Sequence, residues 1–97
     1  MGTYFKLDEK PGLKGYKILS FVGFEYYQTD GSYGVLPARL LHMTYPQYLD
    51  FCEQKLGAKV IRKFNAKYVS IYFPESAELK NFLKVLNTLF ENSIKKV

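Results

Sequence analysis

The fold of this chain is decided by one stretch, Lys59-Val60-Ile61-Arg62-Lys63-Phe64-Asn65-Ala66-Lys67-Tyr68-Val69-Ser70-Ile71-Tyr72-Phe73. Strand-forming residues alternate with polar ones on both sides of Asn65-Ala66, which predicts a β-hairpin with a two-residue turn at residues 58–73. This turn places Val60 opposite Ile71 on an apolar face. We expect that face to join the core, because side chains alternate between the two sides of a strand.

The other face of the same hairpin has a different chemistry. The register that brings Val60 to Ile71 also pairs lysine with tyrosine on the opposite side. The expected pairs are Lys59 with Tyr72, Ile61 with Ser70 and Lys63 with Tyr68. A face of this kind suits an anionic partner with flat rings, and it is the first place to look for function.

Further strands are predicted upstream of this hairpin. Residues 1–15 contain a short edge strand and then a loop with glycines and a proline. Residues 16–36 read as a second hairpin, because Asp30-Gly31 lies between two segments rich in aromatic residues. Pro37 limits the return strand of that hairpin to residues 33–36, at an edge of the sheet.

The first of two helices is predicted at residues 44–56, where apolar residues recur at helical spacing. Thr44 and Gln47 match a capping box, in which the two side chains bond each other's backbone N–H groups. Gly57 stands where a helix is expected to stop, because glycine readily adopts the left-handed conformation that ends helices.

The second helix is predicted at residues 77–95, after Ser76 as its N-cap. Glu78 lies in its first turn, where a negative charge complements the helix dipole. The helix carries a wide apolar stripe, which we expect to be the main covering of the sheet: Leu79, Phe82, Leu83, Leu86, Leu89, Phe90 and Ile94.

The predicted element order is ββαββα, with the N-terminal strand in addition. Strands interrupted by two helices indicate an α+β fold, in which a mostly antiparallel sheet carries both helices on one face. At 97 residues the chain has room for one core, so we expect a single compact domain over residues 1–97.

Composition favours a cytoplasmic protein with no membrane partner. The formal net charge of +5 comes mostly from lysine and favours anionic partners. Cys52 is the single cysteine, so no internal disulfide forms and a reducing compartment is expected. We find no apolar core of a secretory signal and no apolar run that spans a membrane. The abundance of Lys, Tyr, Phe and Asn suggests an AT-rich genome, such as that of a phage or plasmid.

Residue types that catalysis or metal binding requires are sparse. His42 and Cys52 are the single nucleophile–base pair, but Cys52 falls on the apolar helix face, where a buried, inert thiol is expected. His42 is expected to be exposed, just before the helix cap. Asp50 and Glu53 lie one helical turn apart, a spacing more typical of a solvated face than of a cation site. The glycines match no nucleotide-binding motif, so we expect a non-catalytic protein with no metal and no cofactor.

Two surfaces are therefore candidate binding sites. The first is the lysine–tyrosine face of the 58–73 hairpin, formed by Lys59, Lys63, Tyr68 and Tyr72. The second is the tip of the upstream hairpin, with Tyr26, Tyr27 and Tyr33.

Three functional hypotheses and one plain alternative follow from these surfaces. Tyrosine is enriched at protein interfaces, so we favour docking on a protein partner, as an inhibitor or accessory factor. Nucleic-acid binding comes second, because lysines neutralise phosphates and exposed rings stack on bases. A structural homo-oligomer is the third, and a homodimer through a strand edge is compatible with each. The plain alternative is a solvated sheet face on which lysine stems pack against tyrosine rings.

Overall fold

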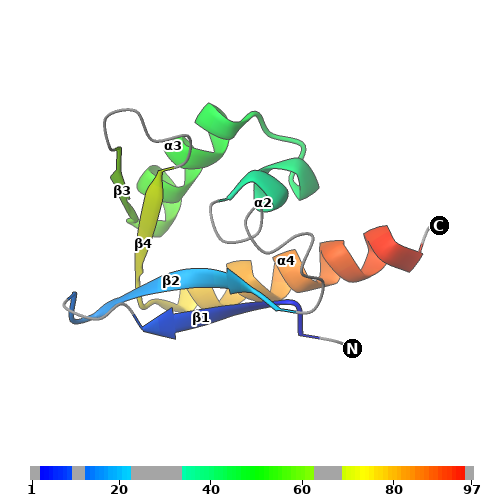
Figure 1. Cartoon of the computed structure of the whole chain (residues 1–97), viewed down its shortest axis with the longest axis horizontal. Coiled ribbons are helices and arrows are strands. Elements are labelled where there is room, and N and C mark those ends of the chain that lie inside the picture. The colour runs from blue at the N-terminus through cyan, green and yellow to red at the C-terminus, as the bar shows by residue number, and fades with distance from the viewer. Residues whose placement is uncertain (1–2, 10–12, 23–33, 63–68, 96–97) are drawn as a thin grey trace.

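The computed structural model describes residues 3–9, 13–22, 34–62 and 69–95 (Figure 1). Four strands and three helices lie in these ranges. They are β1 (Phe5–Glu9), β2 (Tyr16–Phe21), α2 (Val35–Leu40), α3 (Tyr45–Leu56), β3 (Lys59–Ile61), β4 (Ser70–Pro74) and α4 (Ala77–Lys95).

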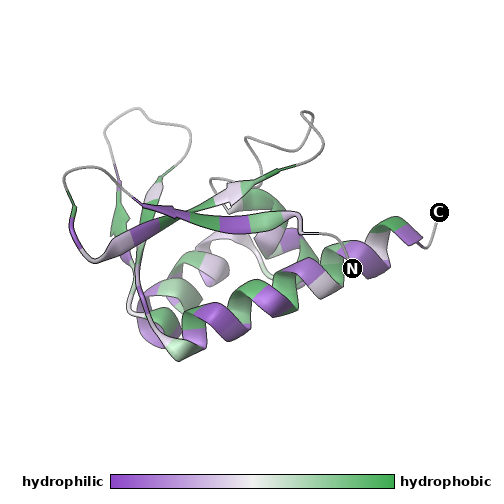
Figure 2. Cartoon of the chain, turned by 90° about the horizontal axis from the view of Figure 1, so that it is seen from below, coloured by the Kyte–Doolittle hydropathy of each residue, from purple (hydrophilic) through white to green (hydrophobic). Residues whose placement is uncertain are grey.

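The strands form a sheet of order β1-β2-β4-β3, and every pairing in it is antiparallel. The central pair, β2 and β4, joins the two halves of the chain. Figure 2 shows the strands as one layer and the helices as a second layer on one side of it. The predicted α+β class and the placement of the helices on one face of an antiparallel sheet are confirmed.

The register of the 58–73 hairpin is confirmed wherever the structure describes it. Lys59 lies opposite Tyr72, Val60 opposite Ile71 and Ile61 opposite Ser70. The turn at Asn65-Ala66 falls outside the described residues. The alternation of residue types in the two strands was therefore sufficient to fix their pairing.

The side of the sheet that faces the helices is apolar. Phe73 and Ile71 of β4 are buried there together with Phe5, Leu19 and Phe21 from β1 and β2. Phe90 of α4 packs against this layer, with its ring centroid 5.1 Å from that of Phe21 in an edge-on arrangement. Such edge-to-face packing is a preferred geometry of aromatic pairs.

The predicted caps of α3 and the predicted N-cap of α4 are present. Thr44 accepts a hydrogen bond from the Gln47 N–H, and the Gln47 side chain accepts one from the Thr44 N–H, which completes the capping box. Gly57 ends α3 in the left-handed conformation, with φ of 66°. Ser76 caps α4 through a 3.0 Å hydrogen bond from the Leu79 N–H.

The apolar stripe of α4 covers the sheet, although its members are not equally deep. Four of them are buried: Leu79, Phe82, Leu86 and Phe90. Leu83 and Ile94 are half-buried at the border of the core.

One sequence prediction is wrong: the described part of the predicted return strand at 33–36 is helical. Val35 begins α2, and Gly34 precedes it in the left-handed conformation, with φ of 93°. Pro37 lies in the first turn of this helix, where a missing N–H is tolerated because it would have no partner. The order is therefore ββααββα, and β2 pairs with β1 and β4.

Burial stabilises α2 in place of the expected strand. Leu36, Pro37 and Ala38 are all buried against the other helices. Gly34 packs so closely on Tyr48 that a Cβ atom there would lie 2.6 Å from a ring carbon. This position therefore requires glycine for both its backbone angle and its lack of a side chain.

Candidate binding face of the sheet

The side of the sheet that faces away from the helices is the candidate site, and we call it the open face. Strand alternation and the observed registers place ten described residues on it, and none of the ten is buried. They are Lys6 and Asp8 of β1, Tyr16, Ile18 and Ser20 of β2, Lys59 and Ile61 of β3, and Ser70, Tyr72 and Pro74 of β4.

Lys59 and two tyrosines form one cluster on this face. Lys59 lies directly opposite Tyr72, and its ammonium nitrogen is 4.8 Å from the centroid of the Tyr16 ring. This distance is within the range of a cation–π interaction. The Lys59 side chain reaches across β4 from β3 to β2, so its stem covers part of the strand while its charge remains exposed.

Sequence reasoning did not select Tyr16 for this cluster. Tyr16 was assigned correctly to a strand, but its contact with Lys59 depends on the pairing of β2 with β4, which places Tyr16 opposite Pro74. No local pattern specifies which two distant strands become neighbours. The opposition of Lys59 and Tyr72, by contrast, lies within one hairpin and was predicted.

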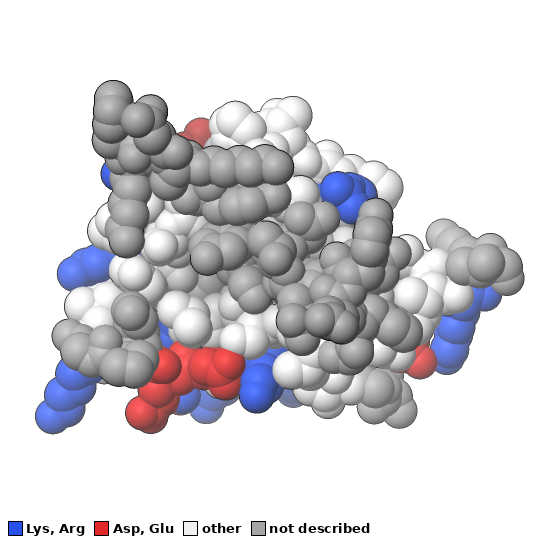
Figure 3. Space-filling model, viewed as in Figure 1, with Lys and Arg blue, Asp and Glu red and all other residues white. Residues whose placement is uncertain are grey.

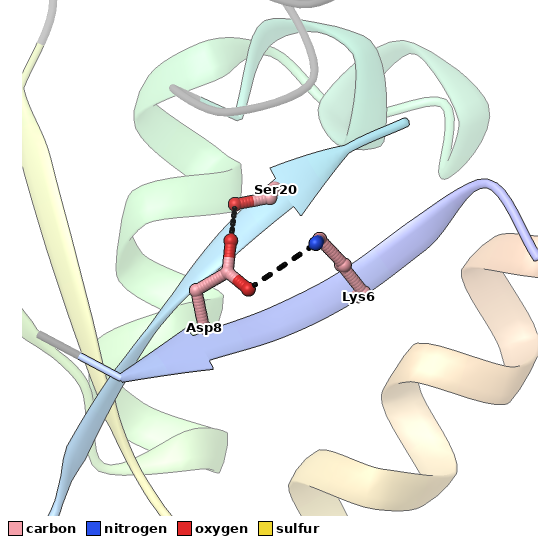
Figure 4. Close-up of polar contacts among 3 residues, drawn as sticks. All are labelled: Lys6, Asp8 and Ser20. Carbon is pink, nitrogen blue, oxygen red and sulfur yellow. Dashed lines mark hydrogen bonds and ion pairs between the residues drawn. The ribbon is translucent and has the colours of Figure 1, made fainter. Parts of the chain in front are cut away.

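A polar group lies at the β1 side of the open face (Figure 4). The Ser20 hydroxyl donates a hydrogen bond to the Asp8 carboxylate, and the Lys6 ammonium lies 3.5 Å from the other carboxylate oxygen. Lys6 and Ser20 are cross-strand neighbours, so one carboxylate bridges the two strands. Because both side chains of the ion pair are well exposed, we assign it little stability, at most about 1 kcal/mol.

The charges around the open face are mixed. Figure 3 shows acidic and basic side chains next to one another along the lower edge of the molecule, where β1 lies. A pocket of about 290 Å³ at the N-terminal end of β2 is likewise lined by both acidic and basic residues. Its lining residues are Glu9, Leu13, Lys14, Gly15, Tyr16, Lys17 and Glu75. The described part of this surface is therefore a mixed patch and not a basic groove.

The remaining predicted surface residues cannot be placed. Lys63, Tyr68, Tyr26, Tyr27 and Tyr33 lie outside the described residues. Of the predicted binding residues, Lys59 and Tyr72 are therefore the two that the structure brings together.

The thiol that sequence reasoning weighed as a nucleophile lies in the core. Cys52 is fully buried, and burial raises the pKa of its thiol to about 12. Since the thiolate is the reactive form, the group is inert at neutral pH. The Tyr48 hydroxyl is buried beside it, and burial raises its pKa well above the usual value.

His42 and the two acids of α3 are all at the surface. His42 is exposed, with φ of 58°, a conformation uncommon outside glycine. Glu53 lies 3.7 Å from the Arg62 guanidinium in an exposed ion pair, so it is already balanced by a cation. Among the described residues, no three His, Cys, Asp or Glu side chains come together as metal ligands would.

No protein-family model matches this chain, and no curated protein or solved structure is significantly similar to it. In the part of the chain that the structure describes, no helix has both the length and the apolar character needed to cross a membrane.

Proposed function

We propose that this protein is a small, non-catalytic binding protein that docks on a protein partner through the open face of its sheet. A cytoplasmic location and a role as an inhibitor or accessory factor of a phage or plasmid are part of this proposal. They rest on the composition of the chain.

The observation that carries the proposal is the composition of the open face. Aromatic and aliphatic side chains extend from β2 across β4 to the β3 edge: Tyr16, Ile18, Tyr72 and Ile61. Lys59 lies beside the two tyrosines, and the ion pair Lys6–Asp8 lies at the opposite, β1 edge. Protein interfaces are enriched in tyrosine and have polar groups at their rim, and this face offers both. Ile61 is 42% exposed, so it adds apolar surface that a partner can bury.

The same face gives weaker support for nucleic-acid binding. Phosphate contacts require several free cations along one path, because each neutralised phosphate adds to affinity. On the described part of the face, Lys6 is paired with Asp8, and the Lys59 charge is placed over a ring. The burial of the Cys52 thiol supports the non-catalytic part of the proposal, since it leaves the obvious nucleophile inaccessible.

A pair of matched double variants tests this proposal. Lys59→Glu with Ile61→Thr alters the open face and keeps a β-branched residue in the strand. Lys84→Glu with Val85→Thr makes the same chemical change on the outer surface of α4. Val85 is a close match for Ile61 because it is 39% exposed.

Each variant and the wild type are immobilised, and extract of the source cell treated with nuclease is passed over them. We expect a defined protein to bind the wild type and the α4 variant and to be lost from the open-face variant. Equal retention by all three proteins would overturn the assignment of the face.

A direct titration with labelled single-stranded oligonucleotides at two salt concentrations addresses the nucleic-acid alternative. Phosphate binding falls steeply with salt, with a log–log slope of about −0.7 per contact for single strands. We expect no such binding at physiological salt. Salt-dependent binding that Lys59→Glu weakens would overturn the choice of a protein partner.

A further inference from the structure

The outer edge of β1 is occupied at one end by a side chain from α4. The Asn87 side-chain oxygen accepts hydrogen bonds from the Tyr4 and Phe5 N–H groups at 2.8 and 2.7 Å. Its amide nitrogen donates one to the Phe5 carbonyl at 3.2 Å. A single amide thus engages both backbone groups of Phe5, as a neighbouring strand would.

These bonds identify which backbone groups of β1 point away from the sheet. The Tyr4 carbonyl accepts a hydrogen bond from the Val22 N–H, so in the strand that follows Lys6 and Asp8 direct their backbone groups towards β2. Because strand geometry repeats every two residues, Leu7 and Glu9 direct theirs outward, as Phe5 does. Within the described part of the chain, no backbone partner satisfies these groups.

No described helix or strand covers the edge beside Leu7 and Glu9. Helix α4 approaches β1 near the N-terminal end of the strand, where Asn87 reaches it, and diverges from it towards Glu9 (Figures 2 and 4). No described element crosses this edge in Figure 2, which is seen from that side.

We propose that the edge of β1 from Leu7 to Glu9 accepts an extended segment of a protein partner as an added antiparallel strand. The unpaired N–H and C=O groups of this edge define the occupant, because an extended backbone presents the complementary groups at the same spacing. This site is separate from the open face and does not depend on it.

The β1 strand of a second copy does not fit this edge. Antiparallel self-pairing centred on Leu7 requires the outward groups of Phe5, which Asn87 already holds. Pairing centred on Asp8 or Glu9 places two like carboxylates directly opposite each other, which is destabilising. The edge therefore disfavours antiparallel pairing of β1 with β1 of a second copy and favours a foreign strand.

The flanking charges define that foreign strand further. Asp8 and Glu9 favour basic residues opposite them, Lys6 favours an acidic one, and the half-buried Leu7 favours an apolar one. In an antiparallel partner segment, the expected order from the N-terminus is two basic residues opposite Glu9 and Asp8, an apolar residue opposite Leu7 and an acidic residue opposite Lys6.

The test is a titration of isotopically labelled protein, followed by NMR, with the peptide acetyl-Thr-Lys-Lys-Val-Glu-amide. Before peptide is added, the Leu7 and Glu9 amides should exchange with solvent quickly, and the Phe5 amide slowly. On addition, the Leu7 and Glu9 signals should shift in a saturable manner and gain protection. Slow exchange at Leu7 and Glu9 in the free protein would overturn the proposal, because the edge would already be paired.

N-methylated peptides serve as matched controls. Methylation of the backbone nitrogen of valine, which faces Leu7, should abolish the shifts of the Leu7 and Glu9 signals. Methylation of the backbone nitrogen of the second lysine, which faces away from β1, should leave the shifts unchanged. Equal behaviour of the two methylated peptides, or the absence of any shift at β1, would overturn strand addition. The capture experiment on the open face remains a separate test of the proposed function.

Discussion

Replacement of Asn87 by alanine tests how the N-terminal strand is held in this fold. The substitution removes three hydrogen bonds that join residues 82 and 83 positions apart in the sequence. Each such bond contributes about 0.5–1.5 kcal/mol net, which sums to about 1.5–4.5 kcal/mol. Because Phe5 is 0% exposed, and a buried backbone group left without a partner costs more than an exposed one, we expect the upper half of this range, about 3–4.5 kcal/mol.

Asn81→Ala is the matched control, because Asn81 is exposed on the same helix and has no side-chain hydrogen bond within the described part of the chain. Both substitutions raise helix propensity by the same amount, up to about 0.7 kcal/mol, so their difference isolates the contribution of the hydrogen bonds. The free energy of unfolding is measured by urea denaturation with linear extrapolation, with the slope checked for constancy. If Asn87→Ala unfolds at the same urea concentration as Asn81→Ala, β1 does not depend on α4 and our reasoning is refuted.

Three further substitutions probe the core. Leu86→Ala should lower the free energy of unfolding by about 2–5 kcal/mol, and Leu83→Ala by clearly less, because Leu86 is fully buried and Leu83 only half-buried; equal losses in thermal or urea melts would contradict this. Cys52→Ala should fold and keep binding, and the wild-type thiol should resist iodoacetamide at pH 7. Since the pKa of Cys52 rises from about 9 unfolded to about 12 folded, wild type should lose stability relative to Cys52→Ala as pH rises from 9 to 12, and a constant difference between them would refute this. Tyr48→Phe should be neutral or stabilising by up to about 1 kcal/mol, because the buried hydroxyl has no hydrogen-bond partner among the described residues; a marked loss of stability would reveal a partner for that hydroxyl.

Sequence reasoning succeeded where the determining contacts are local. The alternation from Lys59 to Phe73 predicted the register of its hairpin, because a shift by one residue would expose Ile71 and Phe73 and bury Lys59. The capping box of α3 and the cap of α4 were likewise readable, since each depends on residues within three positions.

It failed where tertiary packing outweighed local preference. Val35 and Pro37 suit an edge strand, but burial of Leu36 and Ala38 against the neighbouring helices stabilises a helix instead. The same limit applies to the binding face. Tyr16 joins Lys59 only through the pairing of β2 with β4, and Asn87 meets β1 across most of the chain, so neither contact has a local signature.

The central claim is that the open face of the sheet binds a protein. It is tested most directly by the dissociation constant of the captured partner for wild type, for the Lys59→Glu, Ile61→Thr variant and for the Lys84→Glu, Val85→Thr variant. We predict a loss of about tenfold or more in affinity for the open-face variant, equivalent to about 1.4 kcal/mol or more, and a change of less than about twofold for the α4 variant. Equal affinity of all three proteins, or a loss confined to the α4 variant, would contradict the claim.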